Sequence, residues 1–130
     1  MNADALAVRA LIEAYADAVL RRDADDWAAC WTEDAVWDLA GMRVQGRVAI
    51  RALWEQAMQG FAYVGFFAQA GPLTIDGDRA EGRVWTHELL VQADGAKRQS
   101  VGRYDDQYIR GAGGWLFAGR RFAVQQEFAL

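Results

Sequence analysis

The sequence predicts one α+β domain, residues 1–130, in which helices near the N-terminus cover one face of a curved antiparallel sheet. Two observations lead to this prediction. Apolar residues recur at helical spacing in the first half of the chain, and the segments after Gly60 have the character of strands. Turn sequences join those segments consecutively, which is the pattern of an antiparallel meander. Between helices and sheet we expect an apolar pocket that holds a few ionisable side chains.

The first half of the chain is predicted to hold three helices and two short strands. An amphipathic helix runs from Ala5 to Arg22, and Asp4 can cap its start. An acidic step at Asp23–Asp26 leads into a short second helix. This second helix carries Trp27, Cys30 and Trp31 and is expected to end at Thr32–Asp34. Two strands are expected next, at Ala35–Leu39 and around Val44. A third helix then runs from about Val48 to Gln59 and stops at Gly60.

The second half is predicted to be entirely β. Turns at Asp76–Asp78, Ala93–Gly95 and Gly111–Gly114 separate its strands. Gly71 and Pro72 interrupt the first of them and indicate a bulge or bend. The expected strands lie at Tyr63–Ile75, Ala80–Val91, Arg98–Arg110 and Trp115–Glu127.

Strand parity decides which ionisable side chain of the second long strand faces the pocket. Successive residues alternate between the two faces of a sheet. A three-residue loop at Ala93–Gly95, with Gly95 at positive φ, would put Glu88 on the same face as Tyr104. A two-residue turn would put His87 there instead. The turn sequence alone leaves both alternatives open.

Composition excludes several classes of function. The chain is 53% hydrophobic and 25% charged, with a net charge of −4, so we expect no nucleic-acid partner. The apolar runs are too short to span a bilayer, and no secretory signal is evident, so we expect a cytoplasmic protein without a membrane partner. One cysteine, one histidine and no glycine-rich phosphate motif predict neither a metal site nor a cofactor.

The strand Ala80–Val91 carries large apolar side chains on both faces. One face packs against the helices, and the other needs a second cover. We therefore expect a homodimer that forms through the outer face of the sheet.

Several segments carry a resemblance to a known family. They are Tyr15 and Asp23 around the end of the first helix, then WTEDAVWD, DGDRAEGR and, most specifically, VGRYDDQY…GGWLFAGRRF. Together with the order of elements, they make nearly the whole chain resemble the SnoaL-like branch of the nuclear transport factor 2-like superfamily. The resemblance implies a cone-shaped fold, a cavity at its open end and sheet-to-sheet dimers. Relatives include scytalone dehydratase, hexachlorocyclohexane dehydrochlorinase, ketosteroid isomerases, limonene epoxide hydrolase and polyketide cyclases, most of which need no cofactor or metal.

The resemblance also implies roles for single residues. Asp23 matches the aspartate of the dehydrochlorinase, whereas Phe66 stands where that enzyme has its catalytic histidine. Arg120 matches a cavity arginine, and Tyr15 matches a cavity tyrosine of the steroid isomerases. The isomerases' catalytic aspartate falls near Leu39, beside Asp38, and their second acid falls near Asp105 or Asp106. The match favours Glu88 over His87 in the pocket.

These observations lead to a first hypothesis of a cofactor-independent lyase, dehydratase or isomerase that acts on a small aromatic or polycyclic molecule. A carboxylate would remove a proton, and Arg120 with a tyrosine would hold the oxyanion. The alternatives are a non-catalytic binding cone or accessory subunit, and an epoxide or ester hydrolase using Glu88, Arg120 and Asp106. Asp23 could instead cap the second helix, and Glu88 with Arg120 could be a structural ion pair. The predicted catalytic residues are Asp23, Glu88, Tyr15 and Arg120, and the predicted substrate-binding residues are Trp37, Phe66, Tyr104, Asp106 and Tyr108.

Overall fold

A computed structural model describes residues 2–130 of the chain. Its described part contains three helices and six strands. These are α1 (Ala3–Arg21), α2 (Ala24–Ala28), β1 (Trp31–Leu39), β2 (Met42–Gln45), α3 (Arg47–Gln59), β3 (Phe61–Asp76), β4 (Arg79–Gln92), β5 (Lys97–Gly111) and β6 (Gly114–Ala129).

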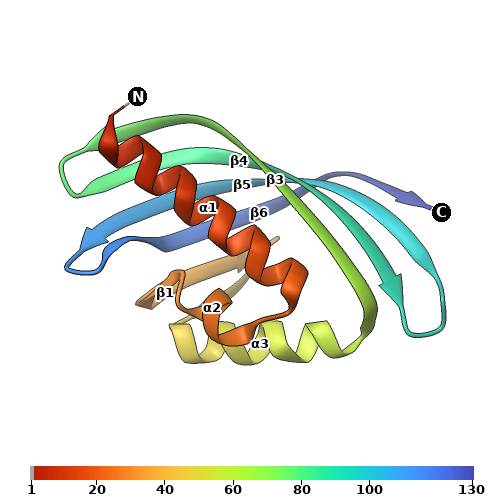
Figure 1. Cartoon of the computed structure of the whole chain (residues 1–130). Helices are drawn as coiled ribbons and strands as arrows, with labels where there is room; N and C mark the ends of the chain where they lie inside the picture. Colours follow the sequence, from red (N-terminus) through yellow and green to blue (C-terminus); the bar gives the residue numbers. More distant parts are fainter. Residues whose placement is uncertain (1) are drawn as a thin grey trace.

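The strands form one curved sheet in the order β2-β1-β6-β5-β4-β3, and α1 lies across one face of it (Figure 1). Strands β3 to β6 make the predicted antiparallel meander. Strand β1 joins this meander parallel to β6, so the sheet is mixed rather than wholly antiparallel. A parallel pair requires a long connection, and here α3 and the first strands of the meander provide it. The predicted α+β fold with a curved sheet around helices is confirmed.

The start of the first helix differs slightly from the prediction. Asn2, rather than Asp4, is its N-cap and accepts a hydrogen bond from the amide of Ala5. Asp4 instead accepts hydrogen bonds from Arg110 and from the indole of Trp115 at the end of the sheet. These contacts fix the N-terminal end of α1 to the β5–β6 hairpin.

The second helix is shorter than predicted. Strand β1 already begins at Trp31, so Trp31 and residues 32–34 belong to the sheet rather than to the helix and its end. Pairing with a distant strand explains the difference, because Trp31 is opposite Phe117 and the amide of Phe117 donates to the carbonyl of Cys30. Such long-range pairing overrides the local helical pattern.

The β4–β5 hairpin resolves the choice of turn. The amide of Gln92 donates to the carbonyl of Ala96, which closes a three-residue loop, and Gly95 in this loop has a φ of +90°. The predicted bulge at Gly71-Pro72 is also present, as a register shift between Ala70 and Leu73. Among residues 2–130, no helix is long and apolar enough to cross a membrane.

Candidate functional site

A cavity of about 250 Å³ opens between α1, α3 and the inner face of the sheet, the face that packs on the helices. Its walls are largely aromatic and aliphatic. Four of them are Tyr15, Trp37, Phe66 and Tyr104. The remaining lining residues are Val19, Leu39, Trp54, Ala57, Met58, Phe61, Glu88, Leu90, Arg98, Ser100, Phe122, Val124 and Glu127.

Glu88 is the carboxylic acid set deepest in this cavity. On β4 it pairs with Ser100 of β5 and Phe66 of β3, so all three face inward. Its carboxyl group makes no hydrogen bond or ion pair to any residue in the range 2–130. Burial raises the pKa of Glu88 to about 7, against a smaller opposing effect of the Arg98 charge. The side chain is therefore poised to exchange a proton near neutral pH.

His87 lies on the opposite, outer face of the sheet. It is exposed, and its ring is 6.5 Å from that of Phe67, another exposed side chain of this face. The three-residue loop of the β4–β5 hairpin produces this arrangement. Of the two alternatives that the turn sequence left open, the structure has Glu88 inside and His87 outside.

Tyr104 provides a hydroxyl group at the cavity wall. Its oxygen accepts a hydrogen bond of 3.1 Å from Nε1 of Trp37, which leaves its own proton available for donation. Burial raises its pKa well above the usual value, against an opposing effect of the Arg120 charge, so the phenol stays protonated. Tyr15 also lines the cavity, and burial raises its pKa in the same way.

Arg120 lies behind the cavity wall rather than in the cavity. Its guanidinium makes two hydrogen bonds to Asp106, of 2.7 and 3.0 Å, and Tyr108 donates a third bond of 2.9 Å to the same carboxylate. The charge of Asp106 raises the pKa of Arg120 although burial opposes it. The cation faces three aromatic rings, with its central carbon 3.7 Å from the ring centre of Tyr104, 4.2 Å from Phe117 and 4.5 Å from Tyr15.

The expected pair between Glu88 and Arg120 does not form. Both residues face inward, but they lie at different heights along the strands. Arg120 is opposite Asp106 on β5, and Asp106 is opposite Gly82 on β4, six residues before Glu88. At roughly 3.3 Å per residue this separates the two rows by about 20 Å along the strand. The cation near Glu88 is Arg98. The trio of Glu88, Arg120 and Asp106 considered for a hydrolase is likewise not assembled.

Asp23 does not line the cavity. It is the N-cap of α2, where one carboxylate oxygen accepts from the amide of Asp26 and the other accepts from Arg21. The bond from Asp26 lowers the pKa of Asp23, so this carboxylate is not tuned toward neutral pH. The structure thus gives Asp23 the capping role that was its alternative.

Two of the predicted substrate-binding residues are also outside the cavity. Asp106 and Tyr108 face inward but are fully buried around Arg120, because bonds within this network use their polar atoms. Trp37, Phe66 and Tyr104 do line the cavity. Their position agrees with the predicted walls, while their contact with a substrate stays a prediction.

The sequence interpretation missed two polar residues of the cavity. Ser100 and Arg98 share the inward parity of Tyr104 on β5, so the alternation argument could have found both. Trp54 and Met58 were predicted on one side of the third helix, but only the packing of α3 over the mouth brings them to the cavity.

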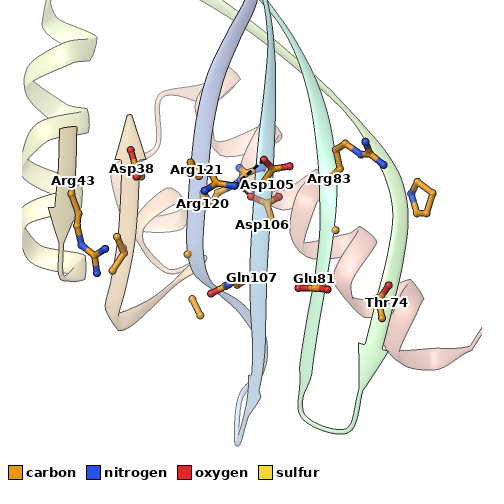
Figure 2. A pocket seen from close by; sticks show the side chains of 15 residues that line it. Asp38, Arg43, Thr74, Glu81, Arg83, Asp105, Asp106, Gln107, Arg120 and Arg121 are labelled. Atoms are coloured by element: carbon orange, nitrogen blue, oxygen red, sulfur yellow. Dashed lines mark hydrogen bonds and ion pairs between the residues drawn. The ribbon is translucent and has the colours of Figure 1, made fainter. Parts of the chain in front are cut away.

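A second hollow, of about 630 Å³, lies on the outer face of the sheet (Figure 2). Five charged side chains lie opposite one another across neighbouring strands, from β2 to β4, and alternate in sign. We call this row the charge ladder; it consists of Arg43, Asp38, Arg121, Asp105 and Arg83. Arg121 and Asp105 are 3.5 Å apart.

Comparison with known proteins identifies the family. Residues 2–121 match the SnoaL-like domain, which is nearly the whole chain. The chain belongs to the SnoaL-like family. No curated protein sequence matches the chain significantly.

Solved structures agree with this assignment. A protein from Novosphingobium aromaticivorans that has been proposed to be an aromatic ring hydroxylase has a TM-score of 0.89 at 26% identity, covering 98% of this chain and 93% of that one. A proposed scytalone dehydratase from the same species has a TM-score of 0.87 at 16% identity, over 95% and 85% of the chains. The hexachlorocyclohexane dehydrochlorinase LinA type 2 has a TM-score of 0.85 at 20% identity, over 98% and 91%. The last two similarities establish a shared fold.

Proposed function

We propose that this SnoaL-like protein is a cofactor-independent lyase, dehydratase or isomerase that removes a proton from carbon in a small aromatic substrate. The observation that carries the proposal is Glu88, a carboxyl group with a pKa of about 7 and no partner, inside an aromatic cavity. A carboxylate that is largely withdrawn from water without a partner is costly to maintain and is typical of functional sites. Glu88 acts as the base in this proposal.

Tyr104 is the proposed donor to the oxyanion that develops when the proton leaves. The indole of Trp37 donates to its oxygen, and in this proposal the phenolic hydrogen turns from the neighbouring Tyr15 hydroxyl toward the substrate. The guanidinium of Arg120, 3.7 Å from the centre of the ring, lowers the pKa of Tyr104 against the larger effect of burial, and a more acidic O–H is a stronger hydrogen-bond donor. Arg120 is therefore a positioning residue, not the direct oxyanion ligand of the first hypothesis.

Hydrogen exchange at carbon tests this function without knowledge of the natural reaction. We expect the protein to accelerate deuterium incorporation into indanone or phenylpyruvate in deuterium oxide, followed by proton NMR. Glu88→Gln should slow this exchange by at least about a hundredfold, because the base is lost. The wild-type rate should rise with pH through about 7, since Glu88 must be ionised to act.

His87→Gln is the matched control, because the neighbouring residue points to the other face. It should leave the exchange rate unchanged. Equal exchange by wild type and Glu88→Gln would contradict the role of Glu88. Absence of exchange with every carbon acid tested would favour the non-catalytic binding cone.

We also propose that a second copy of the chain covers the outer face of the sheet. Exposed apolar side chains gather there on β3 and β4, including Phe67 and Trp85. The charge ladder is self-complementary: a twofold axis along the strands, between β5 and β6, would set Arg121 against Asp105 of the partner subunit and Arg83 against Asp38 of the partner subunit. A ladder of uniform sign would repel its copy.

A further inference from the structure

The volume of the cavity limits the size of its ligand. Its volume of about 250 Å³ lies below the roughly 300–1,000 Å³ of pockets for drug-sized ligands. The aromatic walls suit a flat ring. A cavity of this volume suits a ligand of one ring or two fused rings.

Arg98 is the cation at the mouth of the cavity. It lies on β5, two residues before Ser100, and no other lysine or arginine lines the cavity. Its Nε is buried without a hydrogen-bond partner. The nearest carboxylate oxygen, Oε1 of Glu127, is 3.4 Å away, beyond the roughly 2.7–2.9 Å of a charge-assisted hydrogen bond.

The arginines that are fully paired in this molecule set a standard for comparison. The guanidinium groups of Arg120 and Arg110 each make two or more hydrogen bonds to carboxylates at 2.7–3.0 Å. Arg98 makes none to a carboxylate in the described chain. Its guanidinium is held only by the longer ion pair with Glu127 and by the Phe61 ring, whose centre is 5.9 Å from its central carbon. A ligand carboxylate that replaces Glu127 can bind it in the bidentate geometry that guanidinium prefers.

We propose that the ligand of this cavity is an aromatic carboxylate of one or two rings, whose carboxylate binds Arg98 while its ring packs between Trp37 and Phe66. This deepens the proposed function by naming the substrate class. It rests on the proposed function only for the location of the binding site. Binding of the carboxylate can be measured even if the protein catalyses no reaction. Glu127, on the exposed end of β6, is displaced from Arg98 when the ligand binds.

The charges around the ligand predict the pH dependence of binding. The titratable or charged groups that line the cavity are Tyr15, Glu88, Arg98, Tyr104 and Glu127. Tyr15 and Tyr104 stay neutral, because burial raises both of their pKa values. An ionised Glu88 repels the ligand, so binding of the anion should strengthen as pH falls through about 7.

Phenylacetate and phenylacetamide form a matched pair of probes, since they have nearly the same shape but only one is an anion. Binding can be followed by tryptophan fluorescence, because Trp37 and Trp54 line the cavity. Phenylacetate should bind the wild type at least about tenfold more tightly than phenylacetamide. Arg98→Gln should remove this preference while phenylacetamide still binds. Glu127→Gln should tighten phenylacetate binding and leave phenylacetamide unchanged, since a competing carboxylate is gone.

Arg79→Gln is the control for net charge, because Arg79 is exposed at the far end of β4. It should keep the wild-type preference. Equal affinity of the wild type for the two probes, absence of phenylacetate binding, or an undiminished preference in Arg98→Gln would each overturn the inference. If the protein prefers phenylacetate to phenylacetamide but does not accelerate hydrogen exchange at carbon, only the proposed function is overturned.

Discussion

At the scale of single residues, Glu88 makes the free energy of unfolding depend on pH. Burial raises its pKa from 4.5 to about 7, whereas in the unfolded chain the group is solvated and ionises at its ordinary value. Between these two pH values the folded protein binds the proton more tightly than the unfolded chain does. Protonation of Glu88 therefore stabilises the folded state. This stabilisation is fully present at low pH and is lost as pH rises through about 7.

Glu88→Gln should remove this pH dependence. Relative to the wild type, the variant should gain up to about 3 kcal/mol in free energy of unfolding between about pH 5 and about pH 8. Urea denaturation at the two pH values measures the difference. Glu13→Gln, on the exposed side of α1, is the control and should show no such gain. A constant difference between wild type and Glu88→Gln would mean that Glu88 ionises freely in the folded protein.

At the scale of elements, a glycine determines how β5 and β6 pack beside the cavity. A Cβ atom on Gly102 would lie 2.4 Å from Cε1 of Phe122 and 2.8 Å from Oγ1 of Thr86. The absent side chain lets the Phe122 ring cover β5 and pack 4.8 Å from the ring of Tyr104. Both rings line the cavity, so this close approach shapes its wall.

Gly102→Ala should force the Phe122 ring away from the strand. We expect a loss of about 1–3 kcal/mol in free energy of unfolding, because the core is overpacked. Urea denaturation measures it, and Gly113→Ala is the control, since nothing lies within 4 Å of a Cβ at that turn. A neutral Gly102→Ala would show that Phe122 moves aside without cost.

At the scale of the whole molecule, the outer face of the sheet carries the proposed dimer interface. The charge ladder predicts which residues meet across the twofold axis. Because the ladder alternates in sign, a reversal at one position creates like-charge contacts twice per dimer. Arg83 is a suitable position, since it is exposed and makes no ion pair within residues 2–130.

Arg83→Glu alone and Asp38→Lys alone should each be monomeric in analytical ultracentrifugation. An equimolar mixture should form a heterodimer, because the two reversed charges then face each other. Glu13→Lys on α1 should remain dimeric, and Asp38→Asn controls for the hydrogen bond that Asp38 accepts from Gly41. A wild-type monomer, or a mixture that stays monomeric, would contradict the proposed interface.

Local chemistry allowed much of this protein to be predicted from its sequence. Periodicity placed the helices and the meander, and turn residues placed its hairpins. Family resemblance, together with the three-residue loop, favoured Glu88 in the cavity. The role of Asp23 as a helix cap also depends only on nearby residues, because the amide that it accepts from belongs to Asp26, three residues later. Such features depend on neighbours in the sequence, which the chain itself displays.

The tertiary structure decided what depends on distant partners. Parity predicted that Glu88 and Arg120 share a face, but only the register of three strands separates their rows and gives Arg120 to Asp106. The parallel pairing of β1 with β6 likewise turned Trp31 from helix to strand. Arg98 keeps only a long ion pair of 3.4 Å with Glu127, a residue distant in sequence that the pairing of β5 with β6 brings beside it. Pairing partners and distances of this kind are set by packing of the whole chain, which no local pattern encodes.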